Sequence, residues 1–458
     1  MVSESWSELG PQMIGRTDDV ARVLRTVADA ECCSVVGVSN IGKSTLLRAL
    51  ALPAVVRNHA EAPIAEALFV YVDFNLTLQL TEQGFYEVIL RCLLATLKAA
   101  DAPPELVAEI QKAYQEVITA SSPMLMALAF EQSMEALMSQ PSGWVVLLLD
   151  EFDEVFAGLD SQILVRLRAL KERKWSRLCY VTATDRPLAN IRWERQVGEF
   201  CELFDGHSLY LGPLTPVDAS QFVDAWSQRS DVKFTRQETN FVMDCAGGHP
   251  GLMQATLRFL RRTVQERSWR PEPEDDSRLR QELAGDASVR LECAKLWTDL
   301  TGEEQETLLT WLDGSNGGHN TQTLEEKGIL RESSQGKVVF GCLFAGFVRR
   351  QSLVRRREPL GVRVDVESGD VWVDGTVCGV LTGLEYKLLL LLYGNLNKIV
   401  DKYHIVEGVW GENYIDEVDD ARIEKLISRL REKLEPGVKD SRYLTTVRGR
   451  GYRLVSPE

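Results

Sequence analysis

Short hydrophobic runs alternate with stretches of helical periodicity through the first half of the chain. The runs lie at residues 34–36, 68–72, 144–149, 178–183 and 208–211. Short apolar runs bounded by polar residues are typical of strands buried on both faces of a parallel sheet, and amphipathic helices usually separate such strands. We therefore expect an α/β domain over residues 1–212.

Helical periodicity is clearest in two places. Between about residues 82 and 139 the spacing of apolar positions predicts helices, broken near residues 103 and 122 by prolines. These helices either only cover the sheet or also present a surface to a partner. Near the N-terminus, Val20, Val23, Leu24 and Val27 form the apolar face of a helix for which Thr17 is the expected N-cap.

Beyond residue 212 the pattern divides into smaller parts. Residues 213–270 predict a helical lid, which a Pro-rich acidic break at 271–276 follows. Residues 280–352 predict a small helical domain with a strand near residue 338, and 353–360 a basic linker. In residues 361–458, alternating strands precede three helices and a β-hairpin, and Thr382 with Glu385 forms a capping box.

Composition excludes several classes of protein. The net charge of −15 over 458 residues opposes nucleic-acid binding by the whole chain, so a nucleic-acid site must be a local patch. No apolar run approaches the roughly 20 residues that cross a bilayer, so we expect no membrane contact. The nine cysteines contain no C-x-x-C pair. We expect a cytoplasmic protein without a zinc site or disulfide framework.

The first hydrophobic run leads into a phosphate-binding loop (P-loop) of the form G-x-x-x-x-G-K-S, spelled Gly37-Val38-Ser39-Asn40-Ile41-Gly42-Lys43-Ser44. A helical pattern follows it at once, which is the strand–loop–helix context that the motif requires. Backbone N–H groups of such a loop surround phosphate oxygens, and the helix N-terminus adds a positive dipole. Lys43 should reach the β- and γ-phosphates, and the Ser44 hydroxyl should ligate Mg²⁺. The expected contacts of ATP or ADP in this segment are Gly37, Asn40, Ile41, Gly42, Lys43, Ser44 and Thr45.

The hydrophobic run at 144–149 ends in two carboxylates, Asp150 and Glu151. The carboxyl ends of strands are where ligands bind in open α/β sheets. Asp150 can hold Mg²⁺ through water, and Glu151 can orient and deprotonate the attacking water. We therefore expect Lys43, Asp150 and Glu151 to form the catalytic set of a slow ATPase.

Four further elements resemble those of AAA+ and STAND-type ATPases. Gly15-Arg16 resembles the entry segment of these families, which implies that Arg16 lies near the base. Thr184 and Arg186 follow the strand at 178–183, and the resemblance implies that they sense the γ-phosphate; a simple polar strand exit is the alternative. The Gly248-His249-Pro250 segment resembles the element in which proline couples the lid to the nucleotide, which places Pro250 at the site. The small domain at 280–352 resembles the winged helix that follows the lid in such proteins.

Residues 361–458 closely resemble the OmpR/PhoB-type winged helix of response regulators. The shared signatures are L-T-x-x-E-x-x-L-L from Leu381, V-W-G from Val409, I-S-R-L-R-x-K-L from Ile427 and T-V-R-G-x-G-Y from Thr446. In that family the third helix enters the major groove of DNA and the hairpin contacts phosphates. The DNA-binding positions that the resemblance implies are Arg422, Lys425, Ser428, Arg429, Thr446, Arg448 and Arg450. This segment holds 14 lysines and arginines against 17 aspartates and glutamates, so a protein-binding or oligomerisation module is the alternative.

These features together predict a multidomain protein: a P-loop ASCE-type parallel sheet, a helical lid and two winged helices. The expected function is a STAND-type switch that binds ATP or ADP with Mg²⁺, forms nucleotide-dependent homo-oligomers and binds duplex DNA as a transcription regulator. One alternative is a stress or antiphage-defence sensor whose winged helix binds an effector protein. A second is an origin-recognition-like or transposition ATPase.

Overall fold

The computed structural model describes residues 15–141, 143–173, 177–230, 232–267, 276–312, 321–333, 336–357, 361–364, 371–378, 381–411, 418–435, 438 and 441–455. The acidic break expected at 271–276 lies outside these residues except for Asp276, as does the end of the basic linker, 358–360. The chain forms two compact units, Met1–Val348 and Arg349–Glu458, which are described separately.

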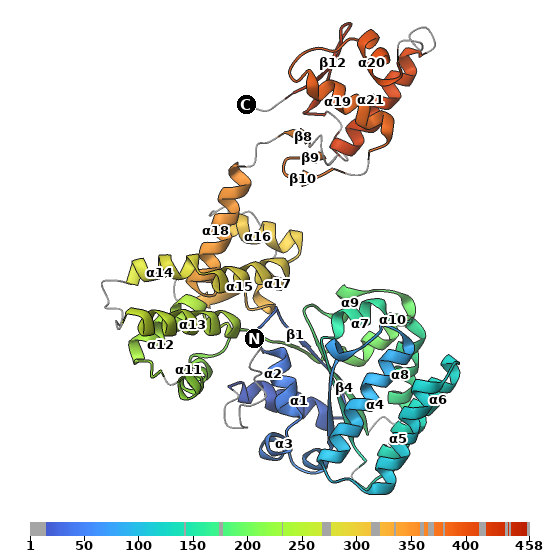
Figure 1. Ribbon diagram of the computed structural model, residues 1–458, viewed down its shortest axis with the longest axis vertical. Helices are drawn as coiled ribbons and strands as arrows, with labels where there is room; N and C mark the ends of the chain where they lie inside the picture. The colour runs from blue at the N-terminus through green and yellow to red at the C-terminus, as the bar shows by residue number, and fades with distance from the viewer. Residues whose placement is uncertain are drawn as a thin grey trace. The chain divides into compact units, whose positions relative to one another are not determined.

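The core of the first unit is a five-stranded parallel sheet of order β2-β3-β4-β1-β5, of which β1 and β4 are labelled in Figure 1. Its strands are β1 (Cys33–Val36), β2 (Leu68–Asp73), β3 (Val145–Asp150), β4 (Leu178–Thr184) and β5 (Ser208–Tyr210). Every residue of β1, β3 and β4 is buried, which explains why these strands read as uninterrupted apolar runs. Asp73 pairs with Asp150, so two carboxylates end neighbouring strands.

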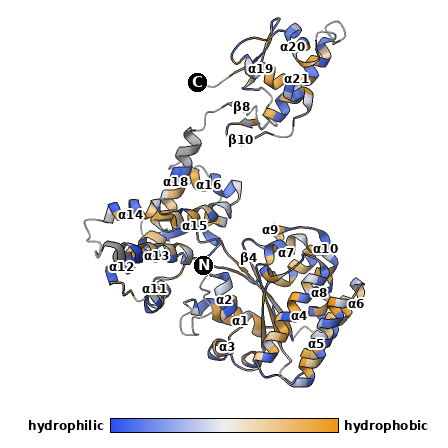
Figure 2. Ribbon diagram, viewed as in Figure 1, coloured by the Kyte–Doolittle hydropathy of each residue, from blue (hydrophilic) through white to orange (hydrophobic). Residues whose placement is uncertain are grey.

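Alternate side chains of β3 enter two different hydrophobic clusters. Val146 and Leu148 pack with α1 and α2, whereas Leu147 and Leu149 pack with α4 and α8. Figure 2 shows hydrophobic residues along the strands and mixed hydrophobic and polar residues along the helices. The helices of this part are α1 (Thr17–Ala28), α2 (Lys43–Leu50), α3 (Pro53–His59), α4 (Glu82–Ala99), α5 (Pro104–Thr119), α6 (Pro123–Met138), α7 (Phe152–Gly158), α8 (Ser161–Arg173), α9 (Leu188–Ile191) and α10 (Arg195–Cys201). Short 3₁₀ turns lie at Ile64–Glu66, Phe74–Leu76 and Glu202–Phe204.

The start of α1 differs from the sequence expectation. The cap position is held by Arg16, whose φ is 94°, and no side chain caps the helix, so the assignment of Thr17 as N-cap was wrong. Left-handed backbone is unfavourable for a residue with a side chain and persists where the surroundings hold it. Here the Arg16 N–H donates to Asp218 Oδ1 at 3.1 Å, a contact made 202 positions away in the chain.

The remainder of the first unit is a set of helices with one small hairpin. Its elements are α11 (Pro216–Ser230), α12 (Arg236–Ala246), α13 (Pro250–Arg267), α14 (Asp276–Gly285), α15 (Ala287–Thr298), α16 (Gly302–Leu312), α17 (Gln322–Glu326), β6 (Leu330–Ser333), β7 (Gly336–Val339) and α18 (Cys342–Arg357). Their apolar side chains continue the cluster that covers one face of the sheet. Helix α12 ends at Ala246, its C-cap residue Gly247 has the left-handed conformation, and Pro250 opens α13.

Among its described residues, the second unit contains the end of α18, two small antiparallel sheets and the helices α19 to α21. Its elements are β8 (Val362–Val364), β9 (Val371–Val373), β10 (Thr376–Val377), α19 (Gly383–Gly394), α20 (Lys402–Val409), α21 (Asp420–Leu434), β11 (Leu444–Val447) and β12 (Gly451–Leu454). The expected capping box is present at α19, where Glu385 accepts from the Thr382 N–H at 2.8 Å. Helix α21 buries Ile423, Leu426, Ile427, Leu430 and Leu434, the apolar face that its sequence predicts.

Candidate functional site

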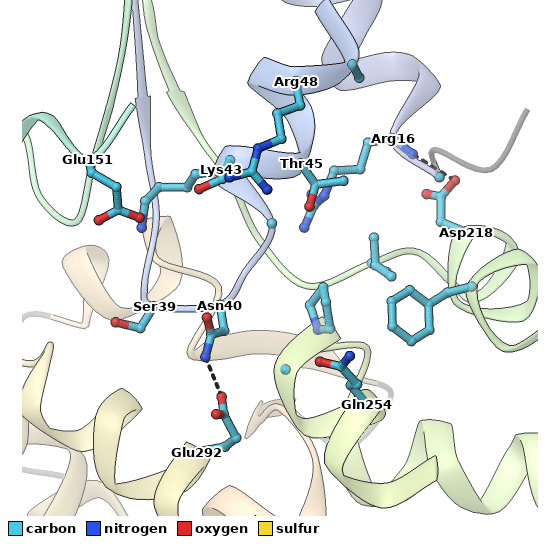
Figure 3. A pocket seen from close by; sticks show the side chains of 18 of the residues that line it. Arg16, Ser39, Asn40, Lys43, Thr45, Arg48, Glu151, Asp218, Gln254 and Glu292 are labelled. Atoms are coloured by element: carbon cyan, nitrogen blue, oxygen red, sulfur yellow. Dashed lines mark hydrogen bonds between the residues drawn. The ribbon is translucent and has the colours of Figure 1, made fainter. Parts of the chain in front are cut away.

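A cavity of about 670 Å³ lies beside the P-loop and the N-terminus of α2 (Figure 3). Its lining comes from distant parts of the first unit: the segment before α1, the P-loop, helices α11 and α13, and α15. Of the predicted site residues, the cavity is lined by Arg16, Asn40, Gly42, Lys43, Ser44, Thr45, Glu151 and Pro250. The structure thus brings most of the expected nucleotide contacts to one hollow.

The local backbone geometry explains why positions 37 and 42 of the P-loop are both glycines. Gly42 has φ of 106° where the loop turns into α2. A Cβ on Gly37 would lie 2.8 Å from Ile41 Cγ2 and 3.1 Å from the Leu211 carbonyl oxygen, so no larger residue fits there without a shift. Ile41 itself is buried and packs into the core rather than lining the cavity.

Lys43 is paired with a carboxylate that the sequence reasoning missed. Its Nζ donates to Asp185 Oδ1 at 2.6 Å and to the Gly37 carbonyl oxygen at 2.7 Å. Asp185 stands between the two predicted sensor residues, and it lines the cavity while they do not. Thr184 is fully buried in β4 and Arg186 is exposed. The signal available in the sequence was an acidic residue at the exit of a buried strand.

Asp150 is buried at the end of β3 with one oxygen paired and one not. Its Oδ2 accepts from the Tyr71 hydroxyl at 2.6 Å, and burial together with this carboxylate raises the pKa of Tyr71. Its Oδ1 is buried without a hydrogen-bond partner among the described residues. A buried unpaired carboxylate oxygen fits a hydrated cation. Asp150 itself does not line the cavity, whereas Ser44 does.

The remaining acids concentrate negative charge here. Glu151 occupies the cap position of α7 with φ of 54° and lines the cavity; burial and then Asp150 raise its pKa. Burial and Asp185 raise the pKa of Asp153 to about 6. Among the described residues, no three acidic, histidine or cysteine side chains are placed to hold a metal alone. Mg²⁺ at this site would therefore need phosphate oxygens and water as further ligands, which is its usual manner of binding.

Four residues from outside the sheet domain hold the tip of the P-loop, and we call them the P-loop clamp: His249, Gly251, Glu292 and Asp299. Asp299 accepts from the Ser39 N–H at 2.6 Å and from the Ser39 hydroxyl at 3.1 Å. Glu292 accepts from Asn40 Nδ2 at 2.7 Å, and Gly251 N–H donates to the Asn40 carbonyl at 3.2 Å.

The histidine of the clamp is neutral. Its Nδ1 accepts from the Leu252 N–H at 3.3 Å, so the proton sits on Nε2, which donates to the Ser39 carbonyl at 3.1 Å. Complete burial lowers the pKa of His249 to about 3, which keeps the ring uncharged near neutral pH.

Arg16 connects the P-loop to the segment after β5. Its Nη2 donates to the carbonyl oxygens of Ile41 at 2.7 Å and Gly212 at 2.8 Å, and its Nη1 pairs with Asp19 at 3.0 Å. Burial lowers the pKa of Arg16. The guanidinium thus fixes the P-loop at the Ile41 carbonyl, and Arg16 also lines the cavity.

In the second unit, the predicted DNA-binding side chains are all open to solvent. All seven are exposed, on α21 and on the β11–β12 hairpin: Arg422, Lys425, Ser428, Arg429, Thr446, Arg448 and Arg450. Arg431, which the sequence reasoning did not single out, donates to the Leu444 carbonyl at 2.8 Å and to Thr446 Oγ1 at 2.7 Å. It therefore fixes the hairpin against α21.

The acids at the start of α21 are partly neutralised. Lys402 lies 2.5 Å from Asp420 and 3.9 Å from Glu424. Asp419 caps the helix through the Arg422 N–H at 2.9 Å. These acids have structural roles, and the basic residues remain available to a ligand.

The parallel sheet, the P-loop and the buried aspartate at the end of β3 define a P-loop NTPase. Residues 10–308 match the family model described as Novel STAND NTPase 1, and the chain belongs to that family. Residues 378–454 match the model for the C-terminal domain of transcriptional regulatory proteins. The chain therefore joins a STAND NTPase to a DNA-binding domain of the OmpR/PhoB type.

Curated relatives match about a fifth to a quarter of the chain. The response regulator ArlR of Staphylococcus haemolyticus is 35% identical over 112 residues, which are 23% of this chain and 49% of that protein. The sensory transduction protein RegX3 of Mycobacterium tuberculosis is 34% identical over 93 residues, 20% of this chain and 40% of that protein. The chain thus spans about half the length, or less, of these relatives.

Solved structures resemble each part at low overall similarity. The RstA DNA-binding domain of Klebsiella pneumoniae, solved with its RstA box, is 25% identical and covers 21% of this chain and 93% of its own, with a TM-score of 0.19. A Walker-type ATPase of Pyrococcus abyssi is 13% identical and covers 75% of this chain and 99% of its own, with a TM-score of 0.44. Among the described residues, no helix combines the length and apolar character needed to cross a membrane.

Proposed function

We propose that this protein is a nucleotide-controlled, DNA-binding transcription regulator. ATP or ADP binds at the P-loop with Mg²⁺, and the nucleotide state sets the arrangement of the lid and the helices that follow it. The change reaches the C-terminal domain, which binds duplex DNA. The protein acts in the cytoplasm.

The P-loop clamp is the observation that carries this proposal. Ser39 and Asn40 belong to the loop that surrounds phosphates, yet residues 249–251 and 292–299 hold them. In a P-loop, phosphate oxygens accept hydrogen bonds from backbone N–H groups such as that of Ser39, which here donates to Asp299. A nucleotide must therefore compete with Asp299, and its binding is coupled to the position of the helices that carry the clamp.

Charge gives the coupling its direction. Glu151, Asp185 and Glu292 line the cavity, and Asp299 contacts the loop at Ser39. A γ-phosphate adds negative charge to this group, and like charges at short distance repel. ATP therefore favours release of the clamp more than ADP does, and the opened form is the one that oligomerises.

The hydrolysis step follows from the same residues. With nucleotide bound, Lys43 would exchange Asp185 for the β- and γ-phosphates, and Ser44 and Asp150 would hold Mg²⁺, which would supply charge that neutralises the phosphates. Glu151 orients the attacking water and accepts its proton, and the environment that raises its pKa favours this proton transfer. Slow hydrolysis returns the protein to the ADP form.

The exposed cations of α21 and the hairpin support the DNA-binding part of the proposal. Arg429 and Lys425 lie on the exposed face of α21, where a major groove would meet them, and Arg448 and Arg450 lie at the hairpin tip. A second candidate function is docking on a protein partner. The excess of acidic residues over residues 361–458, 17 against 14 basic, favours it.

Light scattering of the full chain tests the proposal. The chain is sized with ADP and with a non-hydrolysable ATP analogue, each with and without duplex DNA. We expect a larger species with the ATP analogue and a DNA complex whose amount depends on the nucleotide. One mass under all four conditions would contradict the switch, and DNA binding in neither state would favour the protein-docking function.

A further inference from the structure

Two cysteines outside the nucleotide site lie together where the end of α12 meets the start of α18. Cys245 Sγ and Cys342 Sγ both accept from Nη1 of Arg280, at 3.5 Å and 3.1 Å. Cys245 is buried and Cys342 is exposed. Two sulfurs that share one nitrogen donor lie close to each other, and only one of them is open to solvent.

The backbone holds the two cysteines in this relation. Gly247 and Gly341 have φ of 60° and 61°, and a Cβ on Gly247 would lie 2.2 Å from the Gly341 nitrogen. A Cβ on Gly341 would lie 2.7 Å from the Cys245 carbonyl oxygen. The two chain segments therefore touch through backbone atoms. A disulfide needs Cα atoms roughly 4.4–6.8 Å apart, and this backbone contact, one residue from Cys342 and two from Cys245, is what brings the two cysteines toward that range.

The local charges make Cys342 the more reactive thiol. A hydrogen bond from Cys245, together with the hydrogen bond and charge of Arg280, lowers the pKa of Cys342 to about 6, against burial and Asp244, which raise it. Asp244 lies 3.7 Å from Arg280. A thiolate next to a cation and a second thiol is the arrangement found in redox-sensing cysteines.

We propose that Cys342 and Cys245 form a peroxide-sensitive disulfide that joins α12 covalently to α18. The Cys342 thiolate attacks one oxygen of a hydroperoxide; the O–O bond breaks, Cys342 becomes a sulfenic acid, and the leaving oxygen takes a proton to form an alcohol or water. Cys245 then loses its proton and attacks the Cys342 sulfur; the S–O bond breaks and the hydroxide leaves as water. Two thiols lose two electrons in total, and the hydroperoxide gains them.

The bond would join two parts of the molecule with different tasks. Helix α12 precedes the 249–251 segment that contacts the P-loop, and α18 is the helix by which the chain passes into its second unit. A disulfide between these two helices would hold the P-loop clamp in its contacts with the P-loop. The oxidised protein should therefore exchange bound nucleotide more slowly. This consequence rests on the proposed function, whereas formation of the disulfide does not.

Mass spectrometry of the full chain tests the disulfide. The reduced protein is treated with a stoichiometric amount of hydrogen peroxide, its remaining thiols are alkylated, and non-reducing peptide maps are recorded. We expect a cross-linked peptide pair containing Cys245 and Cys342 as the main product. Cys342→Ser and Cys245→Ser should lose it, and Cys378→Ser and Cys92→Ser should keep it. The Arg280→Gln variant should react about fivefold more slowly than Arg280→Lys, which keeps the charge.

The outcomes separate the two levels of the inference. Oxidation of Cys342 to sulfinic acid without a cross-link, or a main disulfide between other cysteines, would overturn the proposal. A Cys245–Cys342 bond with unchanged release of a fluorescent ADP analogue would keep the redox site and contradict only its effect on the switch. Faster iodoacetamide labelling of Cys342 than of Cys378 at pH 7 is the independent expectation for a thiolate that Arg280 and Cys245 stabilise against the repulsion of Asp244.

Discussion

The carboxylate of Asp299 accepts a hydrogen bond of 2.6 Å from the backbone N–H of Ser39, inside the phosphate-binding loop. A second bond, from the Ser39 hydroxyl at 3.1 Å, makes the contact two-pronged. In the proposed function, a carboxylate placed in this way competes with phosphate for the same donor and repels its charge. It is the most specific feature of the site, and it can be tested directly.

Replacing Asp299 should tighten nucleotide binding. We expect Asp299→Ala to raise ADP affinity about five- to tenfold, since one charge-assisted hydrogen bond is worth roughly 1–2 kcal/mol after solvent competition. Titration calorimetry measures the change. Glu303→Ala removes an exposed acid four positions away and should leave the affinity unaltered. Unchanged or weaker binding by the Asp299 variant would show that Asp299 does not compete with phosphate.

The same residue predicts a pH dependence. Burial raises the pKa of Asp299, so its charge and its repulsion of phosphate are lost as pH falls toward that pKa. As pH is lowered from 7 to 5, the ADP affinity of the natural chain should therefore rise toward that of the Asp299→Ala variant. The difference in affinity between the two proteins should shrink. Glu151 and Asp153 titrate in both proteins, so the comparison isolates Asp299. A difference that is constant with pH would contradict this assignment.

ATP binding should depend on Lys43, and ATP hydrolysis should depend on Glu151. Lys43→Ala should lower ATP affinity at least about tenfold, because it removes the cation that meets the phosphates. Glu151→Gln should bind ATP normally and hydrolyse it about 10²–10⁴-fold more slowly, because a general base usually accelerates a reaction by that factor. Fluorescent-analogue binding and single-turnover hydrolysis measure the two effects. Lys112→Ala, an exposed lysine of α5, is the matched control, and full hydrolysis by the Glu151 variant would remove that residue from the mechanism.

DNA binding should depend on the exposed face of α21. Arg429→Ala should weaken binding of the preferred duplex by about tenfold, corresponding to a contact of roughly 1–3 kcal/mol. If Arg429 instead pairs with a phosphate, the slope of log affinity against log salt should fall by about one. Fluorescence anisotropy over a salt series distinguishes these cases. Lys387→Ala, an exposed cation of α19, serves as the control, and equal affinity of both variants would argue against α21 as the contact.

The fold of the second unit should depend on Glu385. This buried side chain accepts from Lys433 at 2.6 Å and from the Thr382 N–H at 2.8 Å. Burial raises the pKa of Glu385, and these hydrogen bonds outweigh it, so the folded pKa is lowered. The stabilisation is present above the unfolded pKa and is lost as pH falls through the folded value. Glu385→Gln should cost about 1–2 kcal/mol at pH 7.

Hydrogen exchange of the full chain measures this loss at the amides of α19. Exchange there should become faster in Glu385→Gln by the corresponding factor. Glu424→Gln changes an exposed acid 3.9 Å from Lys402 and should have little effect. Equal protection of α19 in both variants would mean that the capping box contributes nothing measurable.

Much of the architecture was predictable because its signals are local. The apolar run at 145–149 required a buried strand, and the acids that follow it had to stand at the carboxyl edge of the sheet. The P-loop spacing required a tight turn into α2, which Gly42 makes. Helix α21 and its apolar face likewise followed from helical periodicity.

The contacts that were missed are long-range ones. Asp299 meets Ser39 across 260 positions, and Asp218 meets Arg16 across 202. No periodicity or motif marks such acids, because only the packing of the lid and the following helices onto the sheet brings them to the loop. The wrong N-cap at Thr17 has the same origin, since the distant Asp218 holds Arg16 in a conformation that local preference disfavours.

The central claim is that the nucleotide at the P-loop sets DNA binding by the last hundred residues. The direct measurement selects duplexes from a random pool with the full chain, and then compares affinity for the enriched duplex with ADP and with a non-hydrolysable ATP analogue. We predict that the two affinities differ at least about fivefold, a coupling of roughly 1 kcal/mol, and that Lys43→Ala abolishes the difference. Equal affinity in both nucleotide states would contradict the account.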